Sequence, residues 1–132
     1  MLMTANIPRC VVHRYAETHN MRETEAVREF DELIKFLKTC ASVTERCAPS
    51  EALDKVWHEF MQFTLEYQEF CLSNFGRVIN HDPSPRERNI GPYLRTRETA
   101  QEMFGELDLF FWPIGAAGAT CCGATTDKII AN

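Results

Sequence analysis

The sequence has no long apolar run and no excess of positive charge, and each absence excludes a class of protein. No stretch approaches the ~20 apolar residues that are needed to cross a bilayer. The formal net charge is −5, whereas proteins that bind nucleic acid normally present a basic face. We therefore expect no membrane insertion and no nucleic-acid partner. Glu87 and Glu98 interrupt the one basic cluster, which we interpret as a solvated loop face; it comprises Arg86, Arg88, Arg95 and Arg97.

The sequence also has no export signal and no regular cysteine framework. Its N-terminus lacks the basic region followed by an apolar run that marks a secretory signal. Without export, disulfides are not expected, so we expect mostly reduced thiols and a cytoplasmic location. Six cysteines are present, and their spacing fits neither a disulfide scaffold nor a zinc site built from two CxxC motifs; they lie at positions 10, 40, 47, 71, 121 and 122.

Local motifs that carry known chemistry are absent as well. The chain contains no P-loop, no glycine pattern for a dinucleotide, no HExxH and no nucleophile elbow. This absence leaves no positive case for catalysis, and we predict that the protein is not an enzyme. The length of 132 residues, with 45% apolar and 25% charged residues, is typical of a single globular domain.

Apolar residues recur at helical spacing along most of the chain. Residues 25–40 carry a one-sided apolar stripe at steps of three and four, with charged residues on the remaining surface, which predicts a helix. A shorter helix is expected over residues 9–19, and another opens at Gly91-Pro92 and ends at Gly105. The stripe of residues 25–40 consists of Val27, Phe30, Leu33, Ile34 and Leu37.

Residues 51–75 carry the longest amphipathic pattern, and they predict one unbroken helix. Ser50 is a good N-cap and Gly76 fits the left-handed position that ends a helix. The aromatic stripe is wide, so we expect it to contact two or more other helices. At 100° per residue one arc contains Leu53, Trp57, Phe60, Thr64, Tyr67 and Cys71.

The C-terminal part of the chain is different in character. Residues 107–114 are apolar and aromatic, and we expect an extended segment packed on the helices. Residues 115–126 are mostly Gly, Ala and Thr, which offer little surface to bury, so this tail should be flexible unless a partner orders it. The sequence thus predicts an all-α fold: a single small domain of about four helices around a long central helix (residues 8–114), followed by a flexible tail (residues 115–132).

A set of aromatic, histidine and glycine motifs suggests a family. With these residues in place, the chain resembles the glycine-rich domain-containing proteins over about residues 8–113. That resemblance implies a small helical domain and no established reaction. The tail departs from the pattern, because Ala and Thr replace much of the glycine and only two adjacent cysteines are present. The matching residues are Arg28-Glu29-Phe30, Phe36-Leu37, Asp54, Trp57-His58, Phe63-Thr64, Tyr67, Phe70-Cys71, Phe75-Gly76, His81–Pro83, Thr96, Phe104-Gly105 and Trp112-Pro113.

Asp54, His58, Cys71 and His81 are the candidate site residues of the helical domain. On one continuous helix His58 and Cys71 are separated by about 20 Å along the axis, so they cannot share a metal ion. Asp54 and His58 are four residues apart and can form a hydrogen bond on one helical face. A contact between Cys71 and His81 would pair a nucleophile with its base, but the place of Cys71 in the apolar arc favours an inert buried thiol.

The tail thiols Cys121 and Cys122 are a separate candidate. Adjacent cysteines among small residues can bind a soft metal such as Cu(I) or Zn(II), or they can be oxidised or modified. The alternative is that they are incidental thiols of a disordered tail. No cofactor is expected apart from zinc or copper at these thiols.

The leading prediction for function is a non-catalytic binding or adaptor domain that presents its C-terminal segment to a protein partner. A first alternative is a precursor or carrier, whose folded part is recognised by an enzyme that modifies the cysteine-containing tail. A second alternative is a small thiol-dependent metal-binding protein that uses Cys121 and Cys122, with or without a further Cys or His. If the protein is an enzyme after all, Asp54, His58, Cys71 and His81 are the residues to suspect.

Overall fold

The structure, a computed structural model, describes residues 7–83, 86–115 and 122–125. It confirms the predicted all-α class for a small domain. No helix in the described ranges is both long enough and apolar enough to cross a membrane. The elements in chain order are α1 (Arg9–Thr18), α2 (Glu23–Ser42), α3 (Glu51–Met61), α4 (Thr64–Phe75), β1 (Asn80–Pro83), the 3-10 helix η2 (Arg86–Asn89), α5 (Ile90–Phe104) and β2 (Cys122–Thr125).

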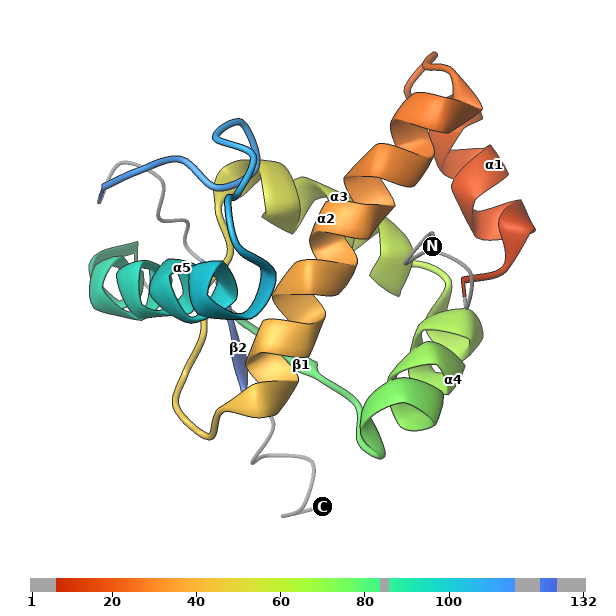
Figure 1. Cartoon of the computed structure of the whole chain (residues 1–132). Coiled ribbons are helices and arrows are strands. Elements are labelled where there is room, and N and C mark those ends of the chain that lie inside the picture. The colour runs from red at the N-terminus through yellow and green to blue at the C-terminus, as the bar shows by residue number, and fades with distance from the viewer. Residues whose placement is uncertain (1–6, 84–85, 116–121, 126–132) are drawn as a thin grey trace.

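The long central helix of the fold is α2, which has 20 residues. In Figure 1 it crosses the front of the molecule with α1 and α4 on one side and α5 on the other, and it contacts α1, α3 and α5. The apolar stripe predicted for residues 25–40 lies on its buried face, where Phe30, Leu33 and Leu37 have no exposed surface. Contact with helices on several sides explains why most of this stripe is buried, with Val27 partly exposed.

The prediction of one unbroken helix over residues 51–75 is wrong. Its two ends are where the sequence placed them: the Ser50 side chain accepts from the Leu53 amide at 3.2 Å, and Gly76 has φ 74°. Between them α3 ends at Met61 and α4 begins at Thr64, because Phe63 (φ −90°, ψ 72°) leaves the helical conformation.

Contacts between buried aromatic side chains account for this bend. A straight helix would separate Trp57 and Tyr67 by about 15 Å along its axis. In the bent chain the Trp57 Nε1–H donates to the Tyr67 hydroxyl at 2.9 Å. The Phe60 ring meets the rings of Tyr67 and Phe70 at centroid distances of 5.1 and 5.6 Å. The bend therefore interrupts the helix near residue 62 and closes an aromatic cluster.

The segment after α5 packs on the helices, as the sequence predicts, but it follows turns rather than an extended path. Leu107, Phe111 and Trp112 are buried in the core. Trp112 Nε1–H donates to the buried carboxylate of Glu32 on α2 at 2.8 Å. The Arg97 guanidinium on α5 donates to the Trp112 carbonyl at 2.9 Å. This segment therefore joins α2 to α5.

Part of the predicted flexible tail forms a strand. Residues 122–125 make up β2, which pairs antiparallel with β1, and His81 lies opposite Ala124 in the register. The other tail residues beyond 115, which include Cys121, lie outside the described residues. Neither strand shows the alternation of apolar and polar residues that would predict a strand from the sequence.

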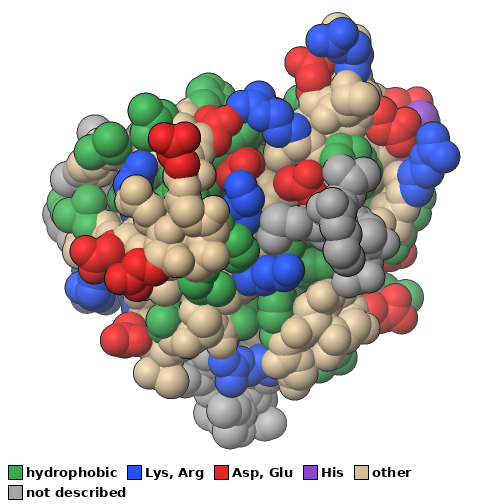
Figure 2. Space-filling view, in the orientation of Figure 1, with side chains coloured by type: hydrophobic (Ala, Val, Ile, Leu, Met, Phe, Trp, Pro, Cys, Tyr) green, Lys and Arg blue, Asp and Glu red, His purple; other side chains and the backbone are tan. Residues whose placement is uncertain are grey.

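Charged side chains of both signs are interspersed on the face shown in Figure 2. Among the described residues on this face no continuous basic area is visible. This distribution is typical of a solvated surface rather than of a phosphate-binding one.

Replacing Tyr67 by Phe should destabilise the protein. The Tyr67 hydroxyl accepts from Trp57 and donates to the Ile79 carbonyl at 2.6 Å, and all three groups are buried. Its removal leaves a buried donor and a buried acceptor unpaired, so the free energy of unfolding should fall by about 1–3 kcal/mol. Urea denaturation measures the change. Leu65→Ala, at an exposed position of α4, is the control and should change it by less than about 0.5 kcal/mol; an equal loss in both variants would contradict the role of the hydroxyl.

Candidate metal site

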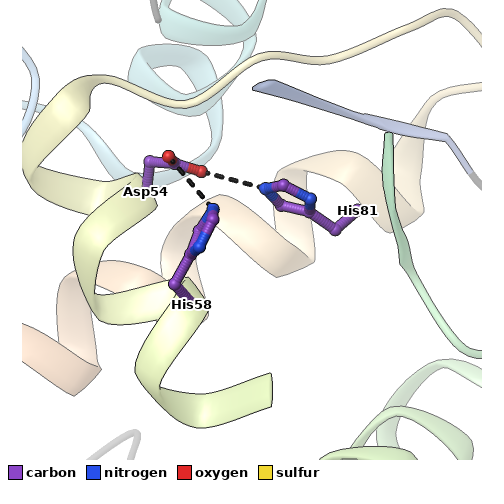
Figure 3. A group of neighbouring side chains, drawn as sticks. All are labelled: Asp54, His58 and His81. Atoms are coloured by element: carbon purple, nitrogen blue, oxygen red, sulfur yellow. Dashed lines mark hydrogen bonds and ion pairs between the residues drawn. The ribbon is translucent and has the colours of Figure 1, made fainter. Parts of the chain in front are cut away.

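Two side chains from a helix and one from a strand lie next to one another (Figure 3). Asp54 and His58 come from α3, and His81 comes from β1. His58 Nε2 lies 3.3 Å from Asp54 Oδ2, and His81 Nε2 lies 3.3 Å from Asp54 Oδ1. One ligand atom from each residue lies within 4.8 Å of the others. The carboxylate is therefore shared by two imidazoles, one on each oxygen.

Local structure fixes the first two residues. The four-residue spacing of Asp54 and His58 puts both side chains on one face of α3. Asp54 lies in the first turn of that helix, where a carboxylate interacts favourably with the helix dipole. The side chain of Asp54 is 15% exposed and that of His58 is 48% exposed, so the site lies at the boundary between core and solvent.

Aromatic packing positions His81. Its ring lies 4.8 Å from the Trp57 ring and 4.4 Å from the His58 ring, measured between centroids. The two imidazole planes are perpendicular, at 90°. His81 has only 14% of its side chain exposed. Trp57, which is completely buried, therefore forms the inner wall of the site, while His58 forms its outer edge.

The site borders an open depression of about 440 Å³. At one side of it, His19 Nε2 lies 3.0 Å from Glu59 Oε1, in a second histidine–carboxylate pair. Water and small solutes can thus reach Asp54 and His58 from this side. The lining residues are His19, Glu51, Asp54, Lys55, His58 and Glu59.

The donor set and its spacing suit a transition-metal ion. Zinc and similar ions bind imidazole nitrogen and carboxylate oxygen at about 2.0–2.2 Å. Ligand atoms at that radius lie about 3.0–3.5 Å apart from one another in octahedral or tetrahedral geometry. The two nitrogen–oxygen separations of 3.3 Å, one to each Asp54 oxygen, fall in this range, and one ligand atom from each residue lies within 4.8 Å of the others. Two histidines and one carboxylate also leave coordination positions open for water or another small ligand.

Cys71 is not part of this group. It is completely buried, and burial raises the pKa of its thiol, an effect that hydrogen bonds with the Ile79 backbone and the Tyr67 hydroxyl partly offset. The contact that the sequence allowed between Cys71 and His81 is replaced by the one between His81 and Asp54. Cys71 therefore lies in a setting typical of an inert packing thiol.

The tail thiols are not placed by the structure. Cys121 lies outside the described residues, and of Cys122 only the backbone, in β2, is described. Metal binding by these two thiols stays a prediction. Of the other cysteines, Cys10, Cys40, Cys47 and Cys71 are free thiols.

The sequence predicted the contact of Asp54 with His58 but missed that His81 joins it. Asp54 and His81 are 27 residues apart. The available signal was the position of His81, in the loop that the sequence predicts after the amphipathic helix of residues 51–75. On an unbroken helix that loop would begin about 30 Å from Asp54, and only the bend at Phe63 brings it back.

Comparison with known protein families gives a match that includes the site residues. The profile of the UCP032817-like family matches residues 1–90, which include Asp54, His58 and His81. No curated protein and no solved structure matches the chain. The resemblance to the glycine-rich domain-containing proteins was therefore wrong, since the matching family is a different one. The motifs that suggested it are mostly buried aromatic residues, which many helical domains share.

Cys71 should resist thiol reagents in the folded protein. At pH 8, iodoacetamide should label the exposed Cys10 at least about tenfold faster than Cys71, because the reagent cannot reach a buried thiol with a raised pKa. Peptide mass mapping over time measures both rates, and unfolding in urea should make them similar. Fast labelling of Cys71 in the folded state would show a reactive thiol instead.

Proposed function

The chain belongs to the UCP032817-like family, an uncharacterised family, and we propose that it binds one divalent transition-metal ion through Asp54, His58 and His81. The observation that carries this proposal is the convergence of both Nε2 atoms on the Asp54 carboxylate at 3.3 Å. The two imidazole rings are perpendicular and lie at the boundary between core and solvent. A shared metal ion accounts for all three side chains at once.

The ligand types select the class of ion. Imidazole nitrogen suits zinc, iron, nickel and copper, whereas magnesium and calcium prefer oxygen ligands throughout. The depression beside Asp54 and His58 gives the ion's open positions access to water and small solutes. Histidine binds a metal ion only through an unprotonated imidazole nitrogen, so protons and the metal ion compete for these two ligands.

The non-protein ligands at those open positions would decide whether the protein only stores the ion or uses it in a reaction. Three protein ligands with water in the next position are the arrangement of catalytic zinc sites, while structural zinc sites have four protein ligands. The described residues supply three ligand side chains in this group. We therefore propose a site that keeps open coordination positions, as catalytic zinc sites do.

A second candidate, the protein-binding domain predicted from the sequence, is favoured by the segment after α5. Three of its apolar side chains are more than half exposed: Leu109 (59%), Phe110 (71%) and Ile114 (72%). Apolar side chains gathered on a surface often mark a contact with another protein. The precursor or carrier alternative and the cytoplasmic location stay predictions.

Metal titration tests the proposed function. Zn(II), monitored by calorimetry, should bind the full chain at one equivalent, and Co(II) should give visible absorption bands. His58→Ala and His81→Ala should each lower the affinity at least about 100-fold, because even the loss of a residue that only supports a ligand costs 10- to 100-fold. His13→Ala is the matched control, since His13 forms a similar i,i+4 pair with Glu17 on α1.

The outcomes separate the two metal hypotheses. Absence of binding by the unmodified chain would exclude a metal function. Binding that survives His58→Ala and His81→Ala but disappears in Cys121→Ser/Cys122→Ser would assign the ion to the tail thiols. Circular dichroism of each variant checks that the helices remain folded.

A further inference from the structure

His81 reaches the site from a short strand with little support of its own. β1 has four residues, and in the described part of the chain its sheet partner is β2, also of four residues. An isolated two-stranded pair is marginal in water. The position of the His81 imidazole must therefore depend on additional contacts to β1 and β2.

Arg46, in the loop between α2 and α3, supplies such contacts. Its Nη1 donates to Asp82 Oδ2 at 2.7 Å, and its Nη2 donates to the Asp82 carbonyl at 2.9 Å. Its Nε donates to the side chain of the buried Asn89, in η2, at 3.0 Å. Asp82 directly follows His81, so one guanidinium fixes both the side chain and the backbone next to the proposed ligand. Charged hydrogen bonds of this kind are stronger than neutral ones.

β2 packs directly on the same guanidinium. Gly123 lies opposite Asp82 in the strand register. A Cβ atom added at Gly123 would overlap Arg46, since its three nearest neighbours are all guanidinium atoms. Only glycine lets the β2 backbone come this close, because the guanidinium is held in place by Asp82 and Asn89 and cannot move aside freely.

We propose that Arg46 and β2 position His81 for the metal, so that docking of residues 122–125 and metal binding strengthen each other. This inference rests on the proposed function. If His81 is in place only while β2 is docked, the apparent affinity for metal scales with the docked fraction. By linkage, a bound ion must then hold β2 in place by the same factor. A bound ion would thereby favour the docked state of residues 122–125.

Full-chain variants test this coupling with Zn(II) alone as the probe. Gly123→Ala and Arg46→Met should each weaken binding about tenfold, the scale expected for residues that orient a ligand. Arg46→Met is informative because removal of a neighbouring positive charge should by itself raise the affinity for a cation. A decrease therefore reports lost positioning. Arg46→Lys, which keeps one donor for Asp82, should restore part of the affinity, and Gly91→Ala in α5 is the control glycine.

Hydrogen exchange gives the reciprocal measurement. Zn(II) should slow amide exchange in residues 122–125 of the unmodified chain, and His58→Ala should abolish this effect without touching either strand. Uptake of zinc with unchanged affinity in both Gly123→Ala and Arg46→Met would overturn the coupling alone. No zinc uptake by the unmodified chain would overturn the proposed function and the coupling with it.

Discussion

A chain of two buried hydrogen bonds, from Trp57 through Tyr67 to the Ile79 carbonyl, connects α3, α4 and the segment that enters β1. The Tyr67 hydroxyl acts as acceptor and donor at once, so it satisfies a buried N–H group and a buried carbonyl that would otherwise be costly. These bonds can form only if the chain bends between α3 and α4. His81 follows Ile79 by two residues, and its ring packs on Trp57. The core therefore helps to set the geometry of the candidate site, together with the contacts that hold β1, the strand in which His81 lies.

This arrangement gives Asp54 an unusual role for a residue in the first turn of a helix. Its two oxygens each face one imidazole, at 3.3 Å in both cases. The inner side is closed by Trp57, and the outer side opens on the depression next to Lys55. Under the proposed function, an ion at this site would stay in contact with water on its outer side. The pairing of β1 with β2 adds a C-terminal segment to the support of the same site.

The likeness to glycine-rich domain-containing proteins was misleading for a physical reason. Residues such as Trp57, Tyr67 and Phe70 are buried core positions, and large aromatic side chains at helical spacing serve the same packing purpose in many unrelated domains. The more specific residues were the polar ones at the edge of that core. Asp54, His58 and His81 lie at the boundary between core and solvent, and a shared metal ion would explain their convergence.

The sequence by itself determined the helical class, the buried stripe of α2, the capping of α3 by Ser50, the end of α4 at Gly76 and the pairing of Asp54 with His58. These features depend on contacts between residues a few positions apart, where helical geometry fixes distance and direction. Only the tertiary structure decided the bend at Phe63, the approach of His81 to Asp54 and the docking of residues 122–125 on β1. No proline or glycine marks residues 62 and 63, and each of these outcomes arises from contacts between residues far apart in the chain, whose energies no local pattern encodes.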